Sequence, residues 1–192
     1  MTAAAETWPL IVDQMSLAEY LNLPGDLRAE IVDGVLRPMT REDRRNREIQ
    51  IMLLLTLRSQ CPPRYLVFHE EVVVLSEVPL LSRIPDVAVI HRSPEDRGRS
   101  NHTAAADVLL AVEVMSGSTR SADLREKPVE YALAGIPAFW RIGLDPDLVV
   151  VTHRLVADEY RVADRFGRGD VVVDAMLPWA AVPVDDLPGT YA

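Results

Sequence analysis

Apolar residues recur along the chain in short segments, some with the spacing of a helix and others with the character of a strand. Within 41–60, Ile49, Leu53 and Leu57 fall near one helical face. The segments 65–75, 86–90 and 107–115 are instead rich in valine and other strand-forming residues. We therefore expect helices over 16–23, 41–60 and 124–134, and strands over 65–75, 86–90, 107–115, 138–142, 148–155, 159–163 and 170–173.

Local signals mark the ends and turns of these elements. Ser16 and Glu19 have the spacing of a capping box, in which the hydroxyl accepts a hydrogen bond from the Glu19 backbone N–H. Asp33-Gly34 predicts a hairpin over 28–38, because both residues tolerate the positive φ of a tight turn. Pro128 removes one backbone donor, so we expect the proline to kink the helix over 124–134 or to confine its start to the preceding few residues.

The order of the segments indicates the fold class. A helix, a hairpin, a second helix, three strands, a third helix and then further strands predict an α+β fold. We expect a mixed sheet flanked by helices, with an N-terminal β-hairpin. The length of 192 residues is typical of one domain, expected over 1–192. Residues 1–15 are expected to be an N-terminal extension, and residues 177–192 a C-terminal tail on the surface.

The net charge of −9 is unevenly distributed along the chain. Residues 1–27 and 170–192 carry four acidic residues each and no basic residue, so the middle of the chain is close to neutral. The overall acidity argues against a general nucleic-acid coat protein, which would be basic. An enzyme that acts on nucleic acid through a local basic surface remains compatible with this distribution.

Other classes of protein are excluded by the composition. The single cysteine, Cys61, rules out a disulfide framework and a Cys-rich zinc site. No apolar run reaches the length of a membrane-spanning helix, and residues 1–10 lack the features of a signal peptide. We therefore expect a cytoplasmic protein that does not contact membranes.

Two acidic residues lie in otherwise apolar strands. Asp86 opens a strand directly after Ile84-Pro85, and Glu113 lies inside the apolar run 109–115. A carboxylate at such a position is costly to bury unless it is paired or binds a cation. Three interpretations stay open at this point: a metal ligand, a buried salt bridge with an arginine, and a glutamate at a strand edge that faces solvent.

The only lysine of the chain follows these acids. Asp123, Lys127 and Tyr131 recur every four residues and so share one face of the expected helix. The alternative interpretation of Asp123 and Lys127 is an ordinary ion pair on the helix surface.

These segments resemble those of a known family when they are taken in order. The motifs are EIVDG over 30–34, PDVAV over 85–89, VEVMS over 112–116, Asp123 with Lys127 and Tyr131, and AGIPAFW over 134–140. In this order they resemble the Uma-two (Uma2) family of restriction-endonuclease-like proteins, formerly a domain of unknown function. That family belongs to the PD-(D/E)XK nuclease superfamily, and the resemblance covers roughly residues 16–187.

The resemblance implies roles for individual residues. Asp86 of the Pro85-Asp86 element and Glu113 would be metal-ligand carboxylates, and the backbone carbonyl of Val114 would complete the metal site. Met115 stands where the superfamily has a lysine, and Lys127 on the next helix would supply the cation. Glu30 would add a ligand or hold a water.

The implied chemistry is a Mg²⁺-dependent (or Mn²⁺-dependent) hydrolysis of DNA phosphodiester bonds by a metal-activated water. Lys127 would stabilise the charge that develops on the phosphate. Arginines near the start of the second expected helix would contact DNA phosphates, or would form a solvated helix face. The candidate residues there are Arg41, Arg44, Arg45 and Asn46. By analogy with the superfamily, we also expect a homodimer.

A second hypothesis is a catalytically weakened or inactive protein of the same fold that acts as a binding or dimerisation module. It is based on Met115, on Pro128 directly after the lysine, and on the absence of a histidine over 40–47, where family members often carry one. Divalent-metal binding discriminates between the two hypotheses.

Overall fold

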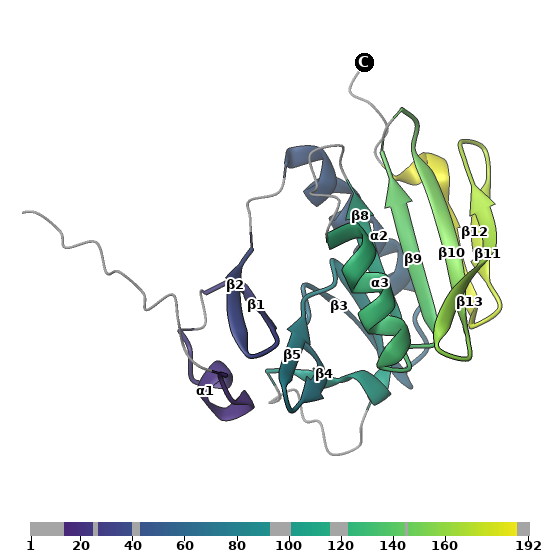
Figure 1. Cartoon of the computed structure of the whole chain (residues 1–192). Helices are drawn as coiled ribbons and strands as arrows, with labels where there is room; N and C mark the ends of the chain where they lie inside the picture. Colours follow the sequence, from purple (N-terminus) through teal and green to yellow (C-terminus); the bar gives the residue numbers. More distant parts are fainter. Residues whose placement is uncertain are drawn as a thin grey trace, which may run out of the picture.

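The computed structural model describes residues 14–24, 27–39, 43–92, 101–115, 123–144 and 146–187. The described strands form sheets of six, five and two strands, and Figure 1 shows a helix on each side of the largest one. The helices are α1 (Leu17–Leu21), α2 (Arg44–Gln60) and α3 (Asp123–Leu133), with short 3₁₀ helices at Ala105–Asp107 and Val184–Asp186. The strands are β1 (Ala29–Val32), β2 (Val35–Pro38), β3 (Tyr65–His69), β4 (Val73–Glu77), β5 (Leu80–Arg83), β6 (Val87–His91), β7 (Thr103–Ala104), β8 (Val108–Met115), β9 (Ala138–Gly143), β10 (Val149–Val156), β11 (Glu159–Phe166), β12 (Val171–Asp174) and β13 (Leu177–Pro183).

The larger sheet has the strand order β11-β10-β9-β8-β6-β3. Its neighbours are antiparallel except for β8 and β9, which run parallel. A parallel pair needs a crossover connection, and α3 lies in the chain between these two strands. The helix that carries Lys127 is therefore tied at both ends to the middle of the sheet.

The core forms on both faces of this sheet. On one face, Ile49, Leu53 and Leu57 of α2 pack with residues of the β12–β13 pair against the sheet. On the other face, Tyr131 of α3 packs with Ile136 and with apolar residues of the sheet. Strands covered on both sides are apolar over most of their length, which explains the continuous apolar runs over 87–90 and 108–112.

The smaller sheet, of order β2-β1-β5-β4-β7, carries the hairpin β1–β2 at its edge. The turn is at Asp33-Gly34, where both residues have positive φ, as expected from the sequence. Ile31 of the hairpin packs with Tyr20 of α1 in a third apolar cluster. The capping box between Ser16 and Glu19 that starts α1 is present.

One expectation about the strands is wrong, and one strand was not expected. The segment 65–75 is not one strand, because β3 belongs to the larger sheet and β4 to the smaller one. Between them Glu70 has a φ of 53°, which a regular strand does not accommodate. Strand β5 had no separate signal in the sequence.

The expectation of a surface tail that starts at residue 177 is wrong for its first part. Residues Leu177–Pro183 form β13, which pairs antiparallel with β12. Leu177, Ala180 and Val182 are buried, and they contribute to the core beside α2. Pro178 and Pro183 lie near the ends of this strand, in a two-stranded pair where a missing N–H is tolerated.

Pro128 lies inside α3, which begins five residues before the proline. No helix in the described ranges is long and apolar enough to cross a membrane.

Gly34 provides a test of how the hairpin is held. Its φ is +75°, and a Cβ at this position would lie 2.7 Å from the backbone Cα of Gln14. We expect Gly34→Ala to lower the free energy of unfolding by about 3 kcal/mol, from the left-handed backbone and the clash together. Urea denaturation measures this loss.

Gly169 is the matched control. Its φ is +83°, but a Cβ there would meet nothing within 4 Å. We expect Gly169→Ala to lose only about 1–2 kcal/mol, the contribution of the backbone conformation. Equal losses in the two variants would contradict the close approach of Gln14 to the hairpin turn.

Candidate metal and phosphate site

Asp86 and Glu113 face each other across two neighbouring strands. Val87 of β6 pairs with Val112 of β8 in antiparallel register, which places Asp86 opposite Glu113. Their neighbours along the strands, Val87, Val112 and Val114, pack on the α2 side of the sheet. Because side chains alternate between the two faces of a strand, the carboxylates lie on the α3 side. Like charges directly opposite each other are destabilising, so this pair needs a cation beside it.

Asp86 is 4% exposed and is held by the neighbouring strand. The backbone N–H of Val114 donates a hydrogen bond to its Oδ2 over 2.6 Å. This bond fixes the Asp86 carboxylate beside the strand that carries Glu113 and the Val114 carbonyl.

The ammonium of Lys127 lies between two carboxylates. Its Nζ is 2.9 Å from Oε1 of Glu30 and 3.2 Å from each carboxylate oxygen of Glu113. Pro128 therefore does not prevent α3 from directing Lys127 to the strand. Lys127 and Glu113 therefore lie in direct contact, and the alternative of an ordinary ion pair on the helix surface does not fit Lys127, since its side chain is 13% exposed.

Glu30 joins the site from the hairpin. Its Oε1 accepts hydrogen bonds from Lys127 and from the backbone N–H of Ile84 over 3.1 Å. Its Oε2 accepts a hydrogen bond from Arg83 over 2.8 Å. Three donors thus hold this carboxylate: Lys127 of α3, Arg83 at the end of β5, and the backbone N–H of the residue after it.

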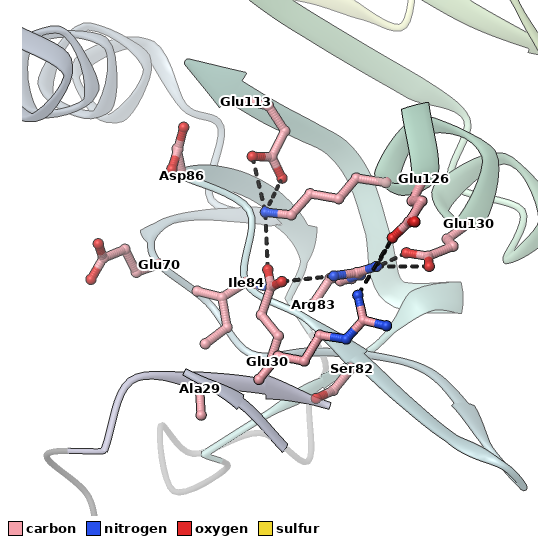
Figure 2. Close-up of polar contacts among 12 residues, drawn as sticks. Ala29, Glu30, Glu70, Ser82, Arg83, Ile84, Asp86, Glu113, Glu126 and Glu130 are labelled. Atoms are coloured by element: carbon pink, nitrogen blue, oxygen red, sulfur yellow. Dashed lines mark hydrogen bonds and ion pairs between the residues drawn. The ribbon is translucent and has the colours of Figure 1, made fainter. Parts of the chain in front are cut away.

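Arg83 is fully buried and connects the hairpin to α3. Its Nε and Nη2 donate to the two oxygens of Glu130 over 2.6 and 2.8 Å, a two-pronged contact that fixes the orientation of both groups. Its Nη2 also lies 3.7 Å from Glu126. Figure 2 shows Glu126 and Glu130 on one side of this network, Glu70 and Asp86 on the other, and Glu30 and Glu113 between them.

Tyr131 completes the network on the helix. One turn after Lys127, its hydroxyl donates to Oε1 of Glu113 over 2.8 Å, and its side chain is fully buried. Glu113 therefore accepts hydrogen bonds from two residues of the same helical face. The side chain of Asp123, expected on that face, lies outside the described residues.

The environment sets the protonation of these groups. Burial lowers the pKa of Lys127, but Glu113, Glu30 and Asp86 more than compensate, so the pKa is raised and the lysine is charged. Burial raises the pKa of Glu30, yet Lys127 and Arg83 outweigh this effect and the net shift is downward. For Glu113, burial prevails over Lys127, and the pKa is raised.

The cluster carries an excess of negative charge. Apart from the exposed Glu126, the acids Glu30, Asp86, Glu113 and Glu130 contribute four formal negative charges, and Lys127 and Arg83 contribute two positive ones. One divalent cation would balance the remaining charge of −2. Buried charges are stable only when they are paired or bind metal, so the donor set fits a hard cation.

Protein side chains alone do not form a complete metal cage here. Across the described ranges, no three His, Cys, Asp or Glu residues gather closely enough to hold a metal ion. The ligand set expected from the sequence contains two carboxylates and a backbone carbonyl. Such a set suits Mg²⁺, which usually keeps several waters when it binds protein.

The candidate DNA-contacting residues near the start of α2 differ in their exposure to solvent. Arg44 and Arg45 lie in the first turn of α2, where Arg44 is exposed and Arg45 half-buried. Asn46 is 4% exposed, so its side chain lies in the interior and not on a surface that DNA could contact. Arg41 lies outside the described residues. DNA contacts of Arg44 and Arg45 stay a prediction.

Sequence reasoning missed two members of the network, Arg83 and Glu130. Arg83 immediately precedes the motif at Ile84-Pro85-Asp86, and Glu130 follows Lys127 by three residues. Tyr131 was found from its spacing, since positions four apart share a helix face. The burial of Arg83 had no local signal, because its main partner, Glu130, lies 47 residues away along the chain.

The mixed sheet with helices on both faces is that of proteins with the restriction-endonuclease-like fold. A crystal structure described as "a putative nuclease belonging to DUF820 from Anabaena variabilis ATCC 29413" is similar to the chain with a TM-score of 0.71 and 20% identity. The similarity covers 90% of this chain and 97% of that one, and it confirms the expected fold class.

The sequence places the chain more narrowly. The model of the Uma2 family, described as "Putative restriction endonuclease", matches residues 17–185, so the chain belongs to this family. The resemblance noted from the ordered motifs is thereby confirmed. A comparison with curated proteins gave no match.

Arg83 allows a test of the network as a stabilising element. Arg83→Leu leaves Glu30 and Glu130 buried without their shared cation, so we expect a loss of about 3–5 kcal/mol in the free energy of unfolding. Urea denaturation with circular dichroism measures it.

Arg161→Leu serves as the control, because Arg161 and its partner Glu159 are both 70% exposed. Exposed ion pairs contribute little to stability, so this variant is expected to resemble the wild type. Similar stabilities of the two variants would contradict the role of Arg83 as the central cation of the network.

Proposed function

We propose that the protein is a Mg²⁺-dependent endonuclease that hydrolyses phosphodiester bonds of DNA. One observation carries this proposal: two carboxylates on neighbouring strands, Asp86 and Glu113, face the same side beside a buried, charged lysine. Membership of a family described as restriction endonucleases supports DNA as the substrate.

The residues divide into metal ligands and phosphate-binding groups. Asp86, Glu113 and the Val114 carbonyl would hold the ion, and bound Mg²⁺ would lower the pKa of a water and offset charge on the phosphate. The Val114 N–H holds Asp86 in position for this role over 2.6 Å. Mn²⁺ would suit the same oxygen ligands.

Lys127 is suited to the charge of the reacting phosphate. Glu30 and Glu113 keep its ammonium protonated and hold it beside the proposed ligands. A fixed cation of this kind stabilises developing negative charge without reorganising during the reaction. Glu30, which three donors hold, positions Lys127 and does not need to bind metal itself.

A second candidate function is the binding module considered from the sequence. It is favoured by the contacts of Lys127, whose ammonium bonds to both oxygens of Glu113 and so already provides that carboxylate with a cation. In this alternative the cluster serves only to join the hairpin, α3 and the large sheet. Metal binding and DNA cleavage separate the two candidates.

Homodimerisation and a cytoplasmic location stay predictions. Since a duplex has two strands, two copies of one site would cut both, and analytical ultracentrifugation of the purified protein measures whether it dimerises.

Removal of the proposed ligands tests the enzymatic function. We expect the wild type to nick or cut supercoiled plasmid DNA with Mg²⁺, and Asp86→Asn and Glu113→Gln to reduce cleavage at least about 100-fold. Gel electrophoresis of plasmid forms gives the rates, and Glu159→Gln is a control at an exposed acid. Cleavage at the wild-type rate by Asp86→Asn would exclude Asp86 as a ligand.

A second test uses stability in place of activity. In Lys127→Met, Glu30 and Glu113 lose their common cation, so we expect Mg²⁺ to raise the melting temperature more in this variant than in the wild type. Cleavage is expected to fall, because the phosphate loses its fixed cation. If Mg²⁺ shifts the melting temperature of neither protein, the binding-module interpretation is favoured over the enzyme.

A further inference from the structure

Two arginines lie on the same face of the hairpin as Glu30. The register of β1 and β2 places Arg37 directly opposite Glu30. Arg28 precedes Glu30 by two residues, and its carbonyl accepts a hydrogen bond from the Met39 N–H, which continues the pairing of the two strands. Because side chains alternate along a strand with a period of two, Arg28, Glu30 and Arg37 point to one side.

The exposure of these three residues differs sharply. Glu30 is buried, with its side chain 9% exposed, whereas the side chains of Arg28 and Arg37 are 44% and 51% exposed. The arginines therefore lie at the rim of the site, and the carboxylate lies at its base.

Each arginine is held by one carboxylate on a different side of the cluster. Arg37 Nη1 lies 3.6 Å from Glu126 of α3, and Arg28 forms an ion pair with Glu70. Figure 2 shows Glu70 on the side of Asp86, and Glu126 on the side of α3. The two guanidinium groups are thus directed to opposite sides of the carboxylates that would bind the metal.

These ion pairs can exchange for contacts with a ligand. Pairs between exposed side chains contribute little free energy, so a phosphate can replace the carboxylate as partner. Glu126 also lies 3.7 Å from the buried Arg83, so it keeps a cationic partner when Arg37 turns away. Arg37 can therefore leave Glu126 for a phosphate while Glu126 keeps its contact with Arg83.

We propose that Arg28 and Arg37 bind the DNA backbone, each contacting a phosphate on one side of the bond that is cut. The proposal rests on the proposed function, because it assumes that the cluster of Asp86, Glu113 and Lys127 receives a phosphodiester. DNA that approaches a site with excess negative charge needs cations at the rim, and guanidinium groups bind phosphate oxygens in pairs. The hairpin, and not only the start of α2, then forms the DNA-binding surface.

Fluorescence anisotropy with a labelled DNA duplex tests the proposal, with Ca²⁺ in place of Mg²⁺ so that binding is measured apart from cleavage. We expect Arg28→Gln and Arg37→Gln each to weaken binding about tenfold. Each is also expected to reduce the slope of log K against log salt by about 0.9, the value for one lost phosphate contact. Arg161→Gln, an exposed arginine in an ion pair on β11, is expected to change neither quantity.

A second variant is expected to strengthen DNA binding rather than weaken it. Glu126→Gln releases Arg37 from its carboxylate, so we expect tighter DNA binding than in the wild type. Glu159→Gln makes the same change of charge beside Arg161 and is expected to bind DNA as the wild type does.

Two results overturn the proposal in distinguishable ways. If the wild type binds and cuts DNA but Arg28→Gln and Arg37→Gln bind like Arg161→Gln, the role of the hairpin is excluded and the proposed function stands. If the wild type neither binds nor cuts DNA, both fail. Circular dichroism of each variant confirms that it is folded.

Discussion

Two buried cations hold together segments that are distant in the sequence. Lys127 joins Glu30 of the hairpin to Glu113 of the large sheet, and Arg83 joins the same Glu30 to Glu130 of α3. Glu30 accepts from both cations, so its position determines how the small sheet, the large sheet and α3 meet. If either cation were removed, carboxylates with little exposure to solvent would lose a cationic partner, and this is much more costly than losing an ion pair at the surface.

The same contacts give the cluster its chemical character. The register of β6 and β8 brings two acids together, and a helix that crosses between parallel strands brings the lysine to them. Lys127 and Tyr131 of this helix hold Glu113, and a backbone N–H holds Asp86. The register of the strands and the packing of the crossover helix therefore bring the residues of the proposed metal site together.

Much of this arrangement could be predicted from the sequence, and the rest could not for definite physical reasons. Asp86 and Glu113 were recognisable because a carboxylate in an apolar strand needs a partner, and Lys127 because it is the only lysine. The facing of the two acids depends on strand register, and a shift of one residue would have turned Glu113 to the other side. Arg83 gave no local sign of burial, because long-range partners decide it. The strand at 177–183 was hidden by its prolines, and the break at Glu70 by a backbone conformation that composition does not reveal.

The long separation of the partners in the chain has a consequence for biosynthesis. Glu30 emerges early from the ribosome, whereas Lys127 and Glu130 emerge only after the hairpin and three of the six strands of the large sheet have been made. The acids cannot acquire their cations until α3 has docked, and contacts between such distant residues form late in folding. A chain that ends before α3 therefore has no assembled cluster, and whatever chemistry the cluster performs begins only after this helix has been made and has docked.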